Sequence, residues 1–187
     1  MAQLAIYNSF HPVLKKKTEE VKEIDDEIRR LVEDMFESMY QADGIGLSAN
    51  QVGISKSIIV IDTAASQTDD LSHPPVVMIN PVIEDSSDDE VDYTEGCLSV
   101  PKFYDNVVRP VNIRVRYYDL NMKEYVKEID GMLSRVMQHE IDHLNGVLFY
   151  ERLSPVRRVL AKSKLKKIQR GKVIPFYPMV LADGKRV

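Results

Sequence analysis

The spacing of apolar residues predicts an amphipathic helix near the start of the chain. Between Ile24 and Tyr40 apolar residues recur at intervals of three and four, with charged residues between them. This period places the apolar side chains on one face of a helix, so that face is expected to be buried. The helix is expected to end before residues 43–53, whose glycines favour a loop or an irregular edge strand.

Four apolar or alternating segments in the middle of the chain have the composition of β-strands. They are residues 57–62, 75–84, 111–119 and 124–130. The polar segment between the first two is expected to be an exposed loop, whereas a connection of hairpin length separates the last two. Apolar and polar residues alternate in the last pair, which predicts antiparallel strands with one face in contact with water.

Two further helices are expected in the C-terminal part of the chain. One covers residues 132–144 and is closed by Asn145 and Gly146 as a left-handed cap. The other covers residues 154–169, with Ser154 as N-cap and a proline in the first turn.

Helices towards both ends with antiparallel strands between them predict an α+β fold. With 187 residues the chain is long enough for one domain and too short for two full ones, so a single domain over residues 1–187 is expected. The expected arrangement has antiparallel strands around a central helix, 132–144. An N-terminal amphipathic helix and a C-terminal basic helix complete it.

Composition excludes some classes of protein. Hydrophobic residues (44%) and charged residues (29%) are typical of a globular domain. No apolar segment has the length of a membrane span or a secretory signal, so a cytoplasmic location without membrane contact is expected. The net charge of −4 argues against nucleic-acid binding over the whole surface. However, residues 84–95 are strongly acidic, and residues 157–172 carry eight Lys or Arg and no acid.

The segment QHEIDHLNG, residues 138–146, carries candidate chemistry. His139 and His143 are four residues apart, so a helix places both imidazoles on one face, where they can bind a single ion. Glu140 lies beside them, as in the H-E-x-x-H arrangement of hydrolytic metal sites. The alternative is a pair of surface histidines beside an ordinary acid. Two of the four histidines in the chain lie here between apolar flanks, which favours a buried metal site.

Two histidines leave a catalytic metal site incomplete, because such sites usually have three protein ligands. The metzincin pattern fails since Phe149 replaces its third histidine, and a thermolysin-like site fails because residues 156–172 contain no acid. The remaining candidates are Glu95, Cys97, Glu151, His11 and His73. Cys97 has the best local context, because Gly96 frees the backbone before it and Pro101 is expected to end the segment. A lone cysteine is more often a small buried apolar residue, and that alternative stays open.

Three segments, in this order and spacing, resemble the signature motifs of the peptide deformylase family. They are GIGLSANQ (44–51), EGCLSVP (95–101) and QHEIDH (138–143). The resemblance extends from HPVL near residue 11 to the basic tail. It implies a metal-dependent hydrolase that removes the N-formyl group from the initiator methionine of newly made polypeptides and releases formate.

The resemblance also assigns roles to particular residues. The implied metal ligands are Cys97, His139 and His143, so the central helix would bear the metal. Glu140 would be the general base and acid, while the side-chain amide of Gln51 and the backbone N–H of Leu98 would stabilise the oxyanion. One divalent ion is implied, iron(II) in the cell, with zinc, nickel or cobalt able to occupy the site.

The implied substrate is an N-formyl-methionyl nascent peptide. The expected substrate-binding residues are Gly44, Ile45, Gly46 and Gly96, and the first three offer backbone to which an extended peptide could add as a strand. The basic helix 157–172 resembles the one by which some family members dock on the ribosome. Its alternative is a solvated amphipathic helix, packed through Val159, Leu160, Leu165 and Ile168.

Ser48, Asn50 and Arg135 depart from the pattern of the family, and Asp142 has two alternative roles. Many family members read GLAAPQ where this chain has GLSANQ, so Asn50 is expected to loosen the loop that holds Gln51. Arg135 stands where some members place an apolar residue of the methionine pocket, which leaves the lining of that pocket open. Asp142 either orients a metal ligand or is simply solvated.

Two other functions fit the sequence less well than a deformylase does. An endopeptidase of the zincin kind is disfavoured because its third ligands are missing. A ribosome-associated binding protein with a structural metal is disfavoured by Glu140, because a structural site needs no such acid.

Overall fold

The computed structural model describes residues 2–65 and 73–187. The α-helices in this part are α1 (Asp26–Gln41), α2 (Gly131–Leu144) and α3 (Pro155–Gln169). The strands are β1 (Ile6–Tyr7), β2 (Gly46–Ser48), β3 (Ile58–Ile61), β4 (Val76–Ser86), β5 (Glu90–Cys97), β6 (Val100–Pro110), β7 (Ile113–Tyr118), β8 (Glu124–Ile129) and β9 (Met179–Val180). A short 3₁₀ helix, η2 (Ala49–Val52), follows β2.

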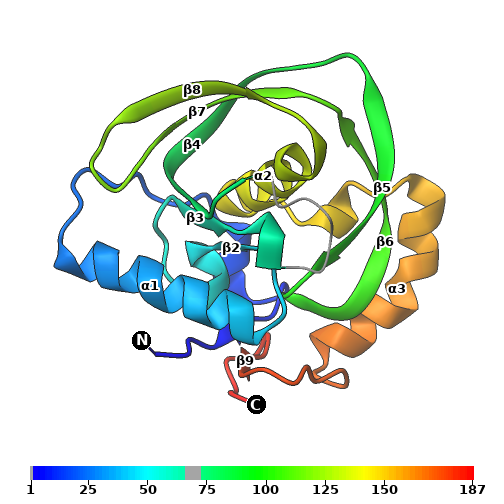
Figure 1. Ribbon diagram of the computed structural model, residues 1–187. Coiled ribbons are helices and arrows are strands. Elements are labelled where there is room, and N and C mark those ends of the chain that lie inside the picture. The colour runs from blue at the N-terminus through cyan, green and yellow to red at the C-terminus, as the bar shows by residue number, and fades with distance from the viewer. Residues whose placement is uncertain (1, 66–72) are drawn as a thin grey trace.

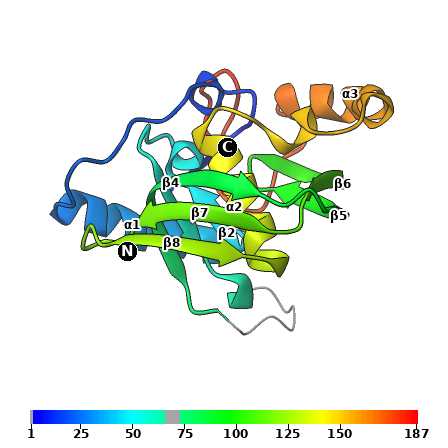
Figure 2. The same cartoon turned by 90° about the horizontal axis from the view of Figure 1, so that it is seen from above.

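The strands surround the central helix α2 (Figure 1). Five of them form an antiparallel sheet in the order β2-β3-β4-β7-β8, and β5 and β6 form a separate antiparallel hairpin. Figure 2 shows β4, β7 and β8 side by side along one side of the molecule, with the β5-β6 hairpin at one end. The predicted α+β fold, with antiparallel strands around a central helix, is confirmed.

The N-terminal helix α1 begins and packs as its sequence predicts. The side chain of Asp25 accepts a hydrogen bond from the backbone N–H of Ile28, which caps the first turn. Val32, Met35 and Met39 are buried in a core cluster shared with β2 and β3. The polar face of the helix points to solvent, so α1 covers one side of the sheet.

The central helix α2 is buried from Leu133 to Leu144 without interruption. It ends at Leu144, and Gly146, two residues later, has a φ of +75°, the predicted left-handed conformation; a Cβ there would lie 2.9 Å from the Lys15 backbone. Asn145 is the C-cap with φ −92° and Gly146 is the left-handed residue, so the predicted cap is confirmed. A helix buried on all sides must find internal partners for its polar side chains.

The hairpin β5-β6 was not predicted, because the segment that forms β5 is rich in acidic residues, and its apolar residues Val91 and Tyr93 are exposed and not part of the core. Pro101 was expected to end its segment but lies near the start of β6. The pairing register shifts between Gly96 and Cys97, and a proline is tolerated near such an irregularity because it cannot donate to the strand ladder. Of the polar segment predicted as an exposed loop, residues 66–72 lie outside the described part of the chain.

The basic helix α3 lies at the edge of the molecule beside β6 (Figure 1). Its buried side chains are Ala161, Leu165 and Ile168, which belong to a cluster with Val100 and Phe103. Val159 and Leu160 are 70% and 76% exposed, so the expectation that they pack against the domain is wrong. Among the described residues, no helix combines the length and apolar character that crossing a membrane requires.

We expect Leu165→Ala to lower the free energy of unfolding by about 2 to 4 kcal/mol, because it leaves a cavity under α3. Leu160→Ala, in the same helix but on its exposed face, is the matched control and is expected to change stability by less than about 0.5 kcal/mol. Urea denaturation of both variants measures the difference. Equal losses would contradict the orientation of α3.

Candidate metal centre

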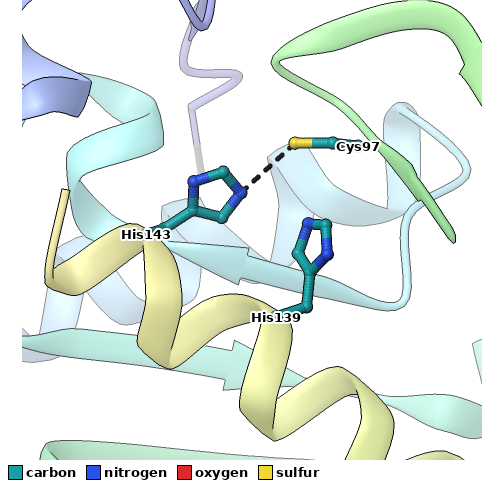
Figure 3. A group of neighbouring side chains, drawn as sticks. All are labelled: Cys97, His139 and His143. Atoms are coloured by element: carbon teal, nitrogen blue, oxygen red, sulfur yellow. Dashed lines mark hydrogen bonds between the residues drawn. The ribbon is translucent and has the colours of Figure 1, made fainter. Parts of the chain in front are cut away.

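Cys97, His139 and His143 converge on one point (Figure 3). Cys97 ends β5, while the two histidines point from successive turns of α2. Their potential ligand atoms all lie within 4.8 Å of one another, and the Cys97 Sγ is 3.2 Å from Nε2 of His143. One thiolate and two imidazoles suit zinc or iron(II), so these residues fit a metal ion.

The other candidates for a third ligand lie elsewhere. Glu151 pairs with Lys15 at 2.7 Å, and the side chain of His11 caps the short helix over residues 12–15. His73 is not part of the cluster of potential ligands. Glu95 is close, but it contacts the far nitrogen of His139 and not the point where the three ligand atoms meet.

Glu95 holds His139 in a fixed orientation. Its Oε2 lies 2.9 Å from Nδ1 of His139, which leaves Nε2 free to face Cys97. The same carboxylate accepts hydrogen bonds from Arg109 at 2.6 and 2.9 Å and from Arg135 at 2.9 Å. Burial alone would raise the pKa of Glu95, but the hydrogen bonds from His139 and Arg109 bring it well below its usual range. The carboxylate is therefore charged, and it orients the histidine as in many metal sites.

Asp142 extends this network on the other side of Arg109. Its Oδ2 accepts a hydrogen bond from Arg109 at 2.7 Å, and both carboxylate oxygens accept from Arg152. Asp142 is buried, so the alternative that its carboxylate is simply solvated is wrong. It reaches His139 only through Arg109 and Glu95.

The pKa values of the two histidines are shifted in opposite directions. Burial lowers the pKa of His143, which favours the neutral ring that binds a cation. Burial acts in the same direction on His139, but its hydrogen bonds with Cys97 and Glu95 outweigh this effect and raise its pKa. A cation at Nε2 of His139 would take the place of the proton that these acidic neighbours favour.

The loop after β2 is tied to the metal-bearing helix. Asn50 is completely buried, and its side-chain amide donates to the backbone oxygen of His143 at 2.6 Å. The expectation that Asn50 loosens this loop is therefore wrong, because a local comparison of motifs does not include a contact with residue 143.

Gln51 points its amide nitrogen at the cluster. Its Oε1 accepts hydrogen bonds from the backbone and the hydroxyl of Ser48, both at 2.9 Å. Its Nε2 then lies 3.2 Å from Oγ of Ser99 and 3.5 Å from Sγ of Cys97. Ser48 thus fixes which end of the amide faces the site.

Glu140 is buried beside the cluster. Burial raises its pKa to about 7, against the influence of His139. Its Oε2 has no hydrogen-bond partner among the described residues. A Cβ on Gly46 would lie 2.8 Å from Oε1 of Glu140, so the glycine makes room for this carboxylate. A buried carboxyl group with a pKa near neutrality and a free oxygen is suited to proton transfer.

A cleft of about 510 Å³ opens over these residues. The predicted site residues that line it are Gly44, Ile45, Gly46, Gln51, Gly96, Cys97, Leu98, His139 and Glu140. His143 lies beneath it, 1% exposed. Arg135 also lines the cleft, but its guanidinium is held by Glu95 and by the backbone oxygens of Val91 and Val107.

Sequence reasoning missed two sets of residues. Arg109 is a single arginine in a strand, and its partners lie 14 and 33 residues away, so no local pattern marks it. Pro175, Phe176 and Tyr177 also line the cleft, although they come from the segment after α3. The two aromatic side chains are a signal in the sequence, but no local pattern indicates that this segment lies against the cleft.

Comparisons with known proteins agree with the geometry. The family model described as polypeptide deformylase matches residues 3–159. A peptide deformylase of Cytophaga hutchinsonii is 43% identical over 168 residues, which cover 90% of this chain and 91% of the relative. A peptide deformylase of Salinibacter ruber is 40% identical over an alignment that covers 98% of this chain and 97% of the relative. The crystal structure of a plant peptide deformylase superposes with a TM-score of 0.85 at 31% identity, covering 95% of this chain and 97% of the other.

We expect Glu95→Gln to lower the free energy of unfolding by about 3 to 5 kcal/mol, because it leaves Arg109 and Arg135 buried with an incomplete counter-charge. Metal affinity is expected to fall about 10- to 100-fold, because His139 loses the charged partner that orients it. Urea denaturation and chelator competition measure the two effects.

The matched control is Glu84→Gln, which also removes a carboxylate that contacts two arginines, Arg114 and Arg116, but at the surface. It is expected to change both properties far less, because exposed ion pairs contribute little. Similar effects of the two substitutions would show that the buried network is not what supports the site.

Proposed function

The chain belongs to the polypeptide deformylase family, and we propose that the residues lining its cleft divide the work of that family's reaction among them. Members of the family are metal-dependent hydrolases that remove the N-formyl group from the initiator methionine of newly made polypeptides. The observation that carries the proposal is the meeting of Cys97, His139 and His143 beside a buried Glu140.

Cys97, His139 and His143 hold the metal ion in this proposal. A divalent ion held by them supplies positive charge that acidifies water and polarises the formyl oxygen. The proposed ion in the cell is iron(II), with zinc, nickel or cobalt able to occupy the site. The mixed sulfur and nitrogen donors support this assignment because they accept each of these metals.

Glu140 is the proposed general base and then general acid. It takes a proton from the water that attacks the formyl carbon and returns a proton to the amine nitrogen as the C–N bond breaks. A pKa of about 7 for Glu140 supports both roles, because a carboxyl group that titrates near neutrality can both accept and donate a proton at the pH of the reaction.

Gln51 and Leu98 are the proposed oxyanion donors. As the water adds, negative charge grows on the formyl oxygen, and donors already aimed at it stabilise that charge without reorganising. The hydrogen bonds from Ser48 support this role for Gln51, because they direct its amide nitrogen toward Cys97. The backbone N–H of Leu98 follows Cys97 directly.

The edge of the five-stranded sheet is the proposed docking site for the formylated nascent peptide. β2 is the terminal strand in the order β2-β3-β4-β7-β8, so one of its edges is free of neighbours in that sheet. Gly46 begins β2 and Gly44 and Ile45 directly precede it, and all three line the cleft, where an extended peptide can pair with the backbone. Gly96 is the proposed contact from β5.

Three broader proposals accompany this mechanism. The whole chain, residues 1–187, acts as a single catalytic domain in the cytoplasm. The basic segment 157–172, which covers most of α3 and the residues just after it, contacts the ribosome. Eight basic residues without an acid support this contact, because ribosomal RNA presents a dense array of phosphates.

We expect Glu140→Gln to reduce formate release from a formyl-methionyl peptide by about 10²- to 10⁴-fold, because the general base and acid is lost. Anaerobically purified protein loaded with iron(II) or nickel is the material to assay. Metal content is expected to match the unmodified protein, because Glu140 is not a ligand in this proposal. Formate release at the unmodified rate would contradict the role of Glu140. No release by the unmodified protein with metal bound would favour a binding protein with a structural metal.

Neutralising α3 tests the ribosome contact. Arg157 pairs with Asp105, and Arg158 donates to the backbone oxygens of Glu151 and Leu153, so other basic residues are better targets. The set to change to glutamine is Lys162, Lys166, Lys167 and Arg170. We expect co-sedimentation with ribosomes to weaken at least about tenfold and to depend less steeply on salt.

The control for this experiment removes four positive charges from another exposed region. The control set is Lys16, Lys17, Lys22 and Arg30, all exposed. It is expected to leave ribosome binding nearly unchanged. Equal weakening by both sets would mean that net charge, and not the surface of α3, determines the interaction.

A further inference from the structure

The segment after α3 returns to the catalytic cleft and forms part of its wall. It passes from α3 to β9, which pairs in parallel with β1 through the register Ile6–Met179 and Tyr7–Val180 (Figure 1). Pro175, Phe176 and Tyr177 lie just before β9 and line the cleft. The match to the family model ends at residue 159, so this wall lies outside the matched segment.

Tyr177 anchors the wall next to the metal centre. Its side chain is only 8% exposed, and its hydroxyl donates to the backbone oxygen of Leu98 at 2.7 Å. Leu98 directly follows the proposed ligand Cys97. The position of residues 175–177 relative to the reacting centre is therefore fixed by a direct hydrogen bond as well as by β9.

Phe176 faces the opening of the cleft. Its ring is 71% exposed, although it stands edge-on to the ring of Tyr177 with centroids 5.3 Å apart. A large apolar side chain at the mouth of a substrate cleft contributes little to the core, so its surface is free to bind a ligand. Tyr93 and Tyr104 are also exposed and line the same cleft, which makes its outer part aromatic.

The peptide that the proposed function places in the cleft extends beyond the reacting centre. An extended peptide advances about 3.3 Å per residue, so the residues after methionine leave the reacting centre by roughly 7 to 10 Å. Phe176 lines the same cleft and is the chain neighbour of Tyr177, whose hydroxyl contacts the backbone of Leu98, so residues of a peptide in the cleft pass beside its ring. Apolar side chains at these positions would be removed from water against its ring.

We propose that Phe176 binds the apolar side chains that follow formyl-methionine and so gives this enzyme a preference for nascent chains with apolar second and third residues. This inference rests on the proposed function, because it assumes that the formylated peptide occupies the cleft. Phe176 is a specificity-determining residue in this proposal and takes no part in the chemical step.

The test compares two peptides, formyl-Met-Leu-Leu and formyl-Met-Ser-Ser, with the metal-loaded full chain. For Phe176→Ala we expect kcat/KM on the Leu-Leu peptide to fall about five- to tenfold, mainly through a higher KM. On the Ser-Ser peptide it is expected to stay within about twofold. Phe176→Leu keeps an apolar side chain and is expected to retain most of the preference.

Ile174→Ala is the matched control, because Ile174 is an apolar residue of the same segment, 50% exposed, that does not line the cleft. It is expected to leave the activity on both peptides unchanged. An equal loss on both peptides for Phe176→Ala, or no loss on either, would overturn the inference while leaving the deformylase activity established. Absence of formate release from both peptides by the unmodified, metal-loaded enzyme would overturn the proposed function, and this inference with it.

Discussion

The buried carboxylate of Glu95 is the interaction on which the arrangement of this site depends. It contacts Arg109 from β6, Arg135 from α2 and the proposed ligand His139. A buried charge is strongly unfavourable unless it is fully paired, so the carboxylate is stable only when the hairpin and the central helix are in their native positions. The contact that closes the hairpin on the helix is therefore also the one that orients the metal ligand.

The central helix depends on its neighbours in the same way, because its polar side chains are buried and find their partners in other elements. Asp142 pairs with Arg109 and Arg152, and Gln138 donates to the backbone oxygen of Pro110. The carbonyl of His143 accepts from Asn50 in the loop after β2. These contacts hold α2 against the end of β6, against Arg152 and against the loop after β2. A metal site that needs residues from three distant parts of the sequence is assembled by the same contacts that satisfy the helix.

The sequence predicted those parts of the structure whose signal is local. The periodicity of α1, the i, i+4 spacing of His139 and His143 and the glycine cap at residue 146 each depend on a few neighbouring residues. The resemblance to known motifs added Cys97, which spacing alone left among several candidates. The β5-β6 hairpin was missed because β5 is rich in acidic residues and its apolar residues Val91 and Tyr93 are exposed. Arg109 and the wall formed by residues 175–177 were missed because their contacts span 14 to 79 residues.

The loop that holds Gln51 shows why a departure from a motif must be interpreted together with the contacts it makes. A proline at this position, as in the motif that the segment resembles, would restrict the backbone covalently and lower the entropy of the unfolded chain, but this protein has Asn50. Here the backbone is restricted by a contact in the folded state, the hydrogen bond that the side-chain amide of Asn50 donates to the carbonyl of His143. The hydroxyl of Ser48 donates a second hydrogen bond, to the side-chain amide oxygen of Gln51. The loop therefore has a different source of rigidity, and that source links the proposed oxyanion donor directly to the helix that bears the proposed metal ligands.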